Sequence, residues 1–373
     1  MQNLKQRAVN LALEKRYETD KKDEEILSNY QNSLIENSDF DIKRTKKEFC
    51  DFILPIEPAK RLEALMNSNH CYLWGLAPNR ATSAKIKKFK KLYFLEDAFL
   101  RSIVPQAQVV EFNKKFYQYS AGYIIDDLTS YFDATRPSRM ETILNSNFIV
   151  HDYEIKRARK IIDKLIESHI SKYNSQPIYK PDFGKNGRKK VLVVDQSYKD
   201  FSITKGCADD KTFEIMLDCA IRENPESDIL IKTHPDTLGN SAKPKCYYQN
   251  VIQRDNILKV DFAINPISII KYVDEIYVCT SQFGFEALML GREVHTFGLP
   301  FYAGWGLTKD RLKTQRRTRK RSIEEIFYVA YILMTQYINP KTNTPCEIEQ
   351  AIDYLIEMRE RYFNEYSNIS VIR

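Results

Sequence analysis

The stretch VLVVDQSYKDFSI (191–203) decides the fold. It begins with an unbroken run of valine and leucine, which predicts a strand buried on both faces of a parallel sheet. Asp195 and Gln196 end that run, and Asp200 and Ser202 follow in a polar loop. Because parallel sheets bind ligands at the carboxyl ends of their strands, a carboxylate here suits a nucleophile or a base. An Asx turn or a helix N-cap is the alternative role for either aspartate.

Downstream, further apolar runs typical of strands alternate with amphipathic helices, such as 209–223. Strands alternating with helices of this length predict right-handed βαβ units and a second α/β domain over 191–345. A stretch rich in Pro, Gly, Asn and Lys precedes it and predicts a linker over 176–190. Upstream of the linker, short apolar runs punctuated by turn residues predict another α/β domain over 69–175.

The two ends of the chain are helical in pattern, with an N-terminal helical segment expected over 1–68 and a C-terminal helix over 346–373. The expected fold class is therefore α/β, with two Rossmann-like domains facing a cleft. That arrangement is GT-B-like, with the N-terminal helical segment added to it.

Composition limits the partners. The 373 residues include 57 Lys+Arg against 50 Asp+Glu, a net charge of +7, which suits an anionic ligand or membrane surface better than a nucleic acid. Seven cysteines without a CxxC pair or a Cys/His cluster indicate reduced thiols in a cytosol and no zinc site. Neither a signal peptide nor an apolar run of about 18 residues is evident, so we expect a cytoplasmic protein that meets a membrane only peripherally.

Two acidic segments of the first α/β domain carry candidate residues. In LEDAFLRS (95–102), Glu96 and Asp97 follow a strand, and Arg101 lies four residues after Asp97. A site and a helix N-terminus with an i,i+4 ion pair fit this segment equally well.

The second segment, DDLTSYFDATRPSRME (126–141), gathers Asp133, Arg136 and Arg139 around a proline turn. A salt-bridged loop explains it on position alone. Carboxylates for sugar hydroxyls and guanidinium groups for a sugar carboxylate are the functional alternative.

Two successive βα units of the second domain offer groups to a phosphate. Strand ends, small hydroxyl residues and a helix N-terminus supply backbone N–H donors and hydroxyls there. The candidate phosphate-binding residues are Lys232, His234, Pro235, Thr280, Ser281 and Gln282. Glu286, one turn into the following helix, is placed to reach ribose hydroxyls.

Two further segments are ambiguous. The aromatic and glycine-rich loop 294–308 contains Tyr302 and Trp305, which suit either an interdomain seam or contact with a sugar or base. The basic run 316–322 suits a solvated helix face first and anionic lipid second.

Taken in order, these segments resemble a known family. The matching motifs run from about residue 71 to about residue 345 and are LEDAFLRS, YFDATRPSRME, DQSYKDFSI, KTHPD, CTSQFGFEALMLG, HTFGLPFYAGWGLT and RRTRKRSIEEIF. They are similar to those of KpsC-type capsule polysaccharide biosynthesis proteins, which are retaining β-Kdo glycosyltransferases. Many such proteins carry two transferase modules, and this chain has room for one.

The resemblance implies transfer of Kdo from CMP-Kdo to a Kdo- or lipid-linked saccharide acceptor, with no metal and no cofactor beyond the donor. It also implies capsule assembly proteins as partners at the inner membrane surface. Its pattern of Gln, three residues, Asp, any residue, Ser matches Gln196, Asp200 and Ser202 and makes Asp200 the nucleophile, with Asp195 as a positioning carboxylate.

The remaining roles follow from the same resemblance. His234 and Ser281 would hold the CMP phosphate and Glu286 the ribose. Glu96, Asp97 and Asp133 would face Kdo or the acceptor. The other residues expected to bind substrate are Arg101, Arg136, Arg139, Gln196, Ser202, Tyr302 and Trp305.

Two alternatives stay open. The first is a transferase of the same fold that uses CMP-sialic acid or a UDP- or GDP-sugar. The second is a non-catalytic protein that binds capsular polysaccharide, which predicts saccharide binding without donor turnover.

Overall fold

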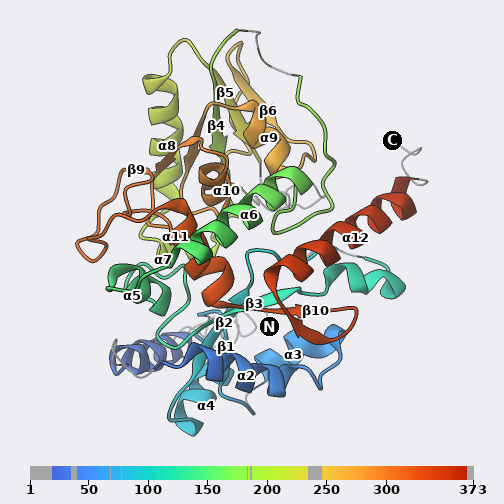
Figure 1. Ribbon diagram of the computed structural model, residues 1–373. Helices are drawn as coiled ribbons and strands as arrows, with labels where there is room; N and C mark the ends of the chain where they lie inside the picture. The colour runs from blue at the N-terminus through green and yellow to red at the C-terminus, as the bar shows by residue number, and fades with distance from the viewer. Residues whose placement is uncertain are drawn as a thin grey trace, which may run out of the picture.

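The computed structural model describes residues 19–34, 40–67, 69–76, 78–106, 108, 110–182, 184, 187–233 and 246–367. These residues form a mixed α/β protein with one sheet of five strands and one of six. The five-stranded sheet lies at the bottom of Figure 1 and the six-stranded sheet at the top. Between them run α6 (Asp152–Ser168) and α12 (Ile348–Ser367). Of the helices in these ranges, none combines the length and apolar character needed to cross a bilayer.

The six-stranded sheet is parallel throughout, with strand order β6-β5-β4-β7-β8-β9. Its strands are β4 (Lys190–Val194), β5 (Asp228–Lys232), β6 (Ile257–Val260), β7 (Glu275–Val278), β8 (Glu293–Thr296) and β9 (Lys309–Asp310). The chain starts at the centre with β4, winds outward through β5 and β6, and then returns to wind the other way from β7. The parallel sheet predicted from VLVVDQ is confirmed.

Both faces of β4 are buried, as its apolar run predicts. Successive side chains of a strand point to opposite faces, so Val191 and Val193 enter one hydrophobic cluster while Leu192 and Val194 enter another. The helices covering these faces are α8 (Asp210–Glu223) on the first side, and α9 (Pro266–Tyr272) and α10 (Phe283–Met289) on the second.

The five-stranded sheet has the order β1-β2-β3-β10-β11. Its strands are β1 (Tyr72–Trp74), β2 (Tyr93–Asp97), β3 (Gly122–Asp126), β10 (Thr335–Asn339) and β11 (Thr344–Cys346). Only β1 and β2 pair in parallel, and the other three pairs are antiparallel. The expectation of a Rossmann-like domain is therefore wrong for this sheet, because short apolar runs predict strands without predicting their direction.

The chain crosses between the sheets twice. β10 and β11 pair with the first sheet, although the predicted second domain extends to residue 345. That boundary is wrong for these two strands, because the free edge of β3, which a local sequence pattern cannot reveal, takes β10 as its neighbour. The predicted C-terminal helix is present as α12, which packs on β10.

The N-terminal helices are part of the first domain rather than an addition to it. In the described part of 1–68, a helix over residues 19–32 precedes α2 (Ile42–Ile53) and α3 (Arg61–Met66). Phe49, Ile53 and Leu65 are buried against strand residues of the first sheet. The other helices are α4 (Arg80–Lys88), α5 (Arg139–Asn145), α7 (Phe201–Lys205), α11 (Ile323–Phe327), two 3₁₀ segments (Pro58–Lys60, Phe112–Gln118) and a π-helix (Tyr328–Leu333).

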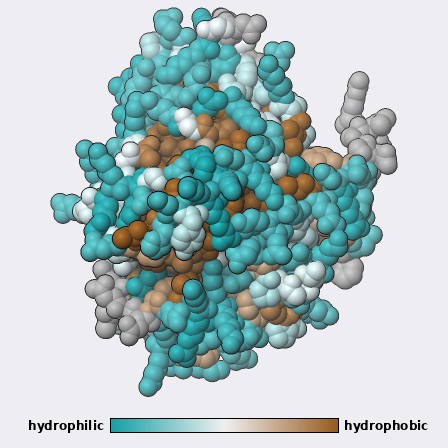
Figure 2. All heavy atoms as spheres, in the orientation of Figure 1, coloured by the Kyte–Doolittle hydropathy of each residue, from teal (hydrophilic) through white to brown (hydrophobic). Residues whose placement is uncertain are grey.

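Most of the surface in Figure 2 is hydrophilic, and hydrophobic residues gather across the middle of the face shown. This is the level at which α6 and α10 lie between the two sheets. The interior there belongs to one cluster that draws on both domains, so the two sheets are joined by a shared core.

Candidate functional site

A cavity of about 560 Å³ lies at the carboxyl ends of β4 and β7, where the winding direction of the parallel sheet reverses. At such a switch point the loops leave in opposite directions and open a crevice, which is where doubly wound sheets bind ligands. The first domain closes the other side of the cavity. The sequence-predicted residues that line it are Glu96, Asp195, Gln196, Asp200, Ser202, Lys232, Thr280, Ser281, Gln282 and Glu286.

Asp195, directly after β4, is held by the backbone. Its Oδ1 accepts N–H groups of Gln196 and Tyr247, each at 2.9 Å, and its Oδ2 accepts the N–H of Tyr248 at 3.0 Å. Burial raises the pKa of this carboxyl, and the N–H donors oppose that rise. With both oxygens engaged, Asp195 fastens the start of the 246–248 segment to the end of β4.

Asp200 is held in a different way. It caps the N-terminus of α7, where Oδ1 accepts the N–H of Ser202 at 2.8 Å and its hydroxyl at 2.6 Å. Its Oδ2 accepts no hydrogen bond from the residues the structure describes, and the side chain is exposed at the cavity. The cap thus orients the carboxylate and leaves one oxygen available.

Gln196 and Thr280 connect the loops on either side of the switch point. Gln196 Oε1 accepts the N–H of Thr280 at 2.8 Å, and Gln196 Nε2 donates to Thr280 Oγ1 at 3.0 Å. Ser202 Oγ lies 3.5 Å from the same hydroxyl. Gln196 was expected to bind substrate, yet its amide already serves Thr280, so it holds the two loops together at the cavity floor.

The end of β5 contributes a lysine. Lys232 is buried in the cavity wall, where Nζ donates to the carbonyl of Thr233 at 3.0 Å, and burial lowers its pKa to about 8. His234 and Pro235, which complete the predicted phosphate-binding group, lie outside the described residues. Ser281 and Gln282 line the cavity after β7, and Gln282 Nε2 donates to the carbonyl of Phe99 at 3.0 Å.

Glu96, the fourth residue of β2, enters the cavity from the first domain. Burial first, and the carboxylates of Asp97 and Asp200 next, raise its pKa from 4.5 to about 8, while Lys172 opposes the rise. Burial lowers the pKa of Lys172, but the facing tyrosines Tyr131 and Tyr173, with Asp97 and Glu96, hold it above its ordinary value. The wall opposite Asp200 therefore combines the Glu96 carboxyl, which binds a proton readily, with the Lys172 ammonium, which stays charged.

Glu286 ties α10 to the segment after α6. Its Oε1 accepts the hydroxyl of Ser171 at 2.5 Å, and burial raises its pKa to about 7. Because Ser171 and Lys172 line the same cavity, the expected ribose-binding carboxylate lies where the two domains meet.

The cavity residues that sequence reasoning missed include four with polar side chains from the first domain and the segment after α6: Tyr131, Ser171, Lys172 and Tyr173. The last three stand at the start of SKYNSQPIY, directly after α6, a stretch assigned in part to the linker. A lysine between hydroxyl residues at the end of an amphipathic helix is the only local signal. Their role depends on the two sheets facing each other.

The 126–141 segment is a buried, ion-paired loop outside the cavity lining, apart from Tyr131 and Phe132. Arg139 donates from Nε and Nη2 to the two oxygens of Asp127, at 2.8 and 2.9 Å. Asp133 accepts the hydroxyl of Thr129 at 2.9 Å, and Arg136 donates to Asn32 at 3.0 Å. The expectation that Asp133, Arg136 and Arg139 contact substrate is not met in this arrangement.

Tyr302 and Trp305 also differ from expectation, because both are core residues. The Tyr302 hydroxyl donates to the carbonyl of Ser281 at 2.5 Å, and Trp305 Nε1 donates to the carbonyl of Phe301 at 2.9 Å. They are 0% and 1% exposed and do not line the cavity. Packing in the core therefore explains these two side chains better, while Pro300 and Phe301 of the same loop line the cavity.

Several arginines of the basic run 316–322 make contacts inside the molecule, while Thr318, Arg319 and Lys320 are exposed. Arg316 and Arg317 both pair with Glu141, at 2.7 and 2.9 Å. Arg321 donates to the carbonyls of Leu144 and Ser146 at 2.7 and 2.9 Å, which places this run over the end of α5. These contacts differ from the expected solvated helix face, and the lipid contact stays a prediction.

Asp97 and Arg101 lie together outside the cavity. They form an ion pair of 2.6 Å, as their i,i+4 spacing predicts, and both line a second, smaller pocket of the first domain.

Glu275, Glu293 and His295 could provide metal ligands. They lie on β7 and β8, with Glu275 and Glu293 at the first residue of each strand, the end away from the cavity. Lysines already neutralise both carboxylates: Lys189 Nζ lies 2.5 Å from Glu275, and Lys309 pairs with Glu293. This cluster is better explained as an ion-pair network at the opposite edge of the sheet.

Comparison with known proteins gives consistent matches. Residues 149–341 match the family described as "Capsule polysaccharide biosynthesis protein". The chain is 37% identical over 300 residues to the capsule polysaccharide modification protein LipA of Neisseria meningitidis serogroup A, an alignment covering 77% of this chain and 41% of LipA. It is 37% identical over 282 residues to the lipopolysaccharide-processing protein LpsZ of Rhizobium meliloti, covering 75% and 62%. The chain thus spans about two fifths of the length of LipA.

Solved structures match as well. The β-Kdo 2,4 transferase of Thermosulfurimonas dismutans KpsC is 35% identical with a TM-score of 0.69, covering 76% of this chain and 86% of that one. The β-Kdo 2,7 transferase of the same protein is 25% identical with a TM-score of 0.56, covering 86% and 98%.

Proposed function

The chain belongs to the capsule polysaccharide biosynthesis protein family, and from that premise we propose that it is a KpsC-type retaining β-Kdo glycosyltransferase. The reaction proposed is transfer of Kdo from CMP-Kdo to a saccharide acceptor, on a GT-B-like pair of domains. One observation carries the proposal. The cavity at the switch point has the available oxygen of Asp200 on one wall, and the Glu96 carboxyl with the Lys172 ammonium on the other.

The nucleotide end of the donor is assigned to the second domain. Lys232 and the hydroxyls of Thr280 and Ser281 line the cavity at the ends of β5 and β7, the two strands that flank β4, where a phosphate is best neutralised. A phosphate near Lys232 favours its charged form, which burial otherwise disfavours. Glu286, at the domain junction, is assigned to the ribose hydroxyls.

Chemistry would proceed in two displacements. In the first, Oδ2 of Asp200 attacks the anomeric carbon of Kdo, and the bond to the phosphate oxygen breaks, so that CMP leaves with the electron pair. In the second, an acceptor hydroxyl attacks the same carbon from the other side and releases Asp200, so two inversions give net retention.

The hydroxyl proton of the acceptor needs a base. Glu96 faces the cavity, and its pKa of about 8 is close to the pH at which a carboxylate can both take and return a proton. Lys172 beside it would pair with the sugar carboxylate of Kdo and so bring the anomeric carbon between Asp200 and Glu96. No step of this scheme needs a metal ion, because the lysines and hydroxyls stabilise the departing phosphate.

The test uses the chain with CMP-Kdo generated in situ and a panel of Kdo-terminated acceptors. We expect CMP release that depends on acceptor and persists in EDTA, and a product whose new linkage is β by NMR. Loss of turnover in EDTA with recovery in Mg²⁺ would contradict the metal-free scheme. Turnover with CMP-sialic acid or UDP-sugars instead would identify a different donor, and saccharide binding without any turnover would identify a binding protein.

A further inference from the structure

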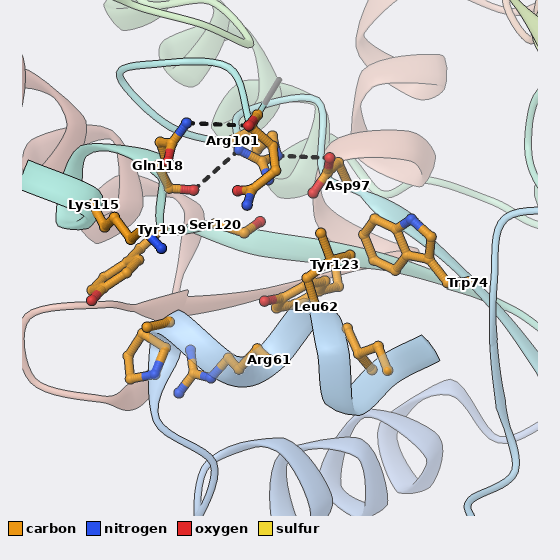
Figure 3. A pocket seen from close by; sticks show the side chains of 14 residues that line it. Arg61, Leu62, Trp74, Asp97, Arg101, Lys115, Gln118, Tyr119, Ser120 and Tyr123 are labelled. Atoms are coloured by element: carbon orange, nitrogen blue, oxygen red, sulfur yellow. Dashed lines mark hydrogen bonds and ion pairs between the residues drawn. The ribbon is translucent and has the colours of Figure 1, made fainter. Parts of the chain in front are cut away.

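The second pocket lies on the other face of β2 from the cavity. Successive strand residues point to opposite faces, so Glu96 enters the cavity and Asp97 enters this pocket. Gln106 lines both spaces. In Figure 3 the side chains around the pocket come from α3, β1, β2, β3 and the 3₁₀ segment Phe112–Gln118 with the residues that follow it. Trp74 lies at the right and Lys115 and Tyr119 at the left. Its volume of about 60 Å³ holds a few water molecules or a small charged group.

Positive charge dominates the lining, with Arg61, Arg101 and Lys115 against the single carboxylate of Asp97. Arg101 is bound on several sides: it pairs with Asp97 at 2.6 Å and donates to the carbonyl of Gln118 at 3.1 Å (Figure 3). An excess of two cations beside one carboxylate favours an anionic guest.

Two buried polar atoms here have no partner within the described chain. Arg61 is 2% exposed, and its Nη1 makes no hydrogen bond, although its Nε donates to the carbonyl of Ile56 at 3.2 Å. Asp97 Oδ1 likewise accepts none. Buried polar groups are nearly always satisfied, so one free donor and one free acceptor in the same pocket indicate a missing polar ligand.

Aromatic residues complete the lining. Trp74 and Tyr123 pack edge to face, with ring centroids 6.3 Å apart, and Tyr119 stands at the other end. A ring face next to a guanidinium and a carboxylate suits a saccharide that bears both hydroxyls and an acidic group.

We propose that this pocket receives the carboxylate group of an acidic sugar residue of the acceptor, an inference that rests on the proposed function of the cavity. Arg61 and Lys115 would receive the carboxylate, and Asp97 Oδ1 would accept a sugar hydroxyl. The acceptor chain would then pass along Gln106, which both spaces share, and present its reacting hydroxyl to Glu96.

Tryptophan fluorescence tests binding without requiring turnover. The chain has two tryptophans; Trp74 lines this pocket, and Trp305 is 1% exposed in the core. The probe is the methyl β-glycoside of Kdo, compared with methyl β-glucoside and with inorganic phosphate. We expect a saturable change with the Kdo glycoside that is absent in Trp74→Phe and at least tenfold weaker with both other probes. An equal response to phosphate, or no response to the Kdo glycoside, would overturn the assignment.

Lys115→Gln and Lys114→Gln form a matched pair, because each removes one positive charge from adjacent positions of the same 3₁₀ segment. Lys114 pairs with Glu111 at 3.6 Å and does not line the pocket. We expect Lys115→Gln to weaken binding of the Kdo glycoside about tenfold, as loss of one charged contact does, and Lys114→Gln to leave it within twofold. Equal effects of the two variants would show that the probe senses net charge only, and the inference would fail.

Kinetics separate this inference from the proposed function. We expect Lys115→Gln to raise the acceptor KM about tenfold, and to raise it far more than the donor KM. A wild-type acceptor KM in this variant would reject the pocket while the transferase proposal stands. Conversely, no donor turnover in the wild-type chain, together with Lys115-dependent binding of the Kdo glycoside, would reject the transferase proposal and keep the pocket.

Discussion

The loops after β3 and after β4 both place aspartates at the end of a buried strand, yet they use them differently. After β3, Asp126 accepts backbone N–H groups on both oxygens, and Asp127 is bound bidentately by Arg139. After β4, Asp195 is engaged in the same way, but Asp200 keeps one oxygen for the cavity. Position at a strand end therefore does not identify a reactive carboxylate. A reactive carboxylate is distinguished by hydrogen bonds that orient it through one oxygen and leave the other oxygen available.

The largest effect is expected from Asp200→Asn. Asparagine caps helices as well as aspartate does, so α7 and the fold should persist, while the amide cannot act as the nucleophile. We expect transfer to fall by about 10³-fold or more. The measurement is CMP release, with intact-protein mass spectrometry of the wild type after CMP-Kdo without acceptor. A variant that keeps a tenth of the activity, or a Kdo adduct mapped to Asp195 or Glu96, would show that another residue is the nucleophile.

Whereas Asp200→Asn should cause a large loss of activity, Asp127→Ala should cause a large loss of stability. It leaves the buried guanidinium of Arg139 without its bidentate partner, which typically costs about 3–5 kcal/mol of unfolding free energy. Urea unfolding measures this. The control is Arg44→Ala, which removes an exposed i,i+4 pair with Glu48 and should change the free energy of unfolding far less. Similar losses in the two variants would mean that burial does not determine how much each ion pair contributes to the free energy of unfolding.

Glu96→Gln tests the carboxyl that faces Asp200. We expect transfer to fall about 10²-fold, a typical loss for an acid/base group. Because the folded pKa is about 8 against an ordinary 4.5, the folded chain binds this proton more tightly, and wild-type stability should fall as the pH rises through that window.

The variant lacks this loss. The difference in unfolding free energy between variant and wild type should therefore shift in favour of the variant as the pH rises from 5 to 8.5, by on the order of 1 kcal/mol after allowance for partial exposure. Urea unfolding at the two pH values measures the difference. A constant difference between wild type and variant would mean that Glu96 has an ordinary pKa.

The smallest effect is expected from Asp195→Asn. The asparagine amide replaces one acceptor oxygen of Asp195 with an NH₂ donor that faces a backbone N–H. This should lower the free energy of unfolding by about 1–3 kcal/mol and loosen the 246–248 segment. Transfer should fall only about tenfold, because this residue positions the loop and does not react. A loss as large as that of Asp200→Asn, in a variant that unfolds normally, would reverse the two roles.

Several features were determined by the sequence itself. The apolar run 191–194 indicated a central parallel strand, because four successive apolar side chains can be buried on both faces of a sheet. The order of motifs around Asp200, Lys232 and Thr280 placed three loops at one edge of one sheet, since parallel strands end together. The family resemblance rested on the same segments.

Other features were decided only by tertiary structure. Whether Asp133 and Arg139 serve the fold or a ligand depends on partners such as Thr129 and Asp127, which a local pattern does not specify. The pairing of β10 with β3 and the entry of Lys172 into the cavity depend on how the two sheets meet. The physical reason is the same in each case: local sequence determines periodicity and burial, whereas hydrogen-bond saturation and the composition of a cavity depend on residues far apart in the chain.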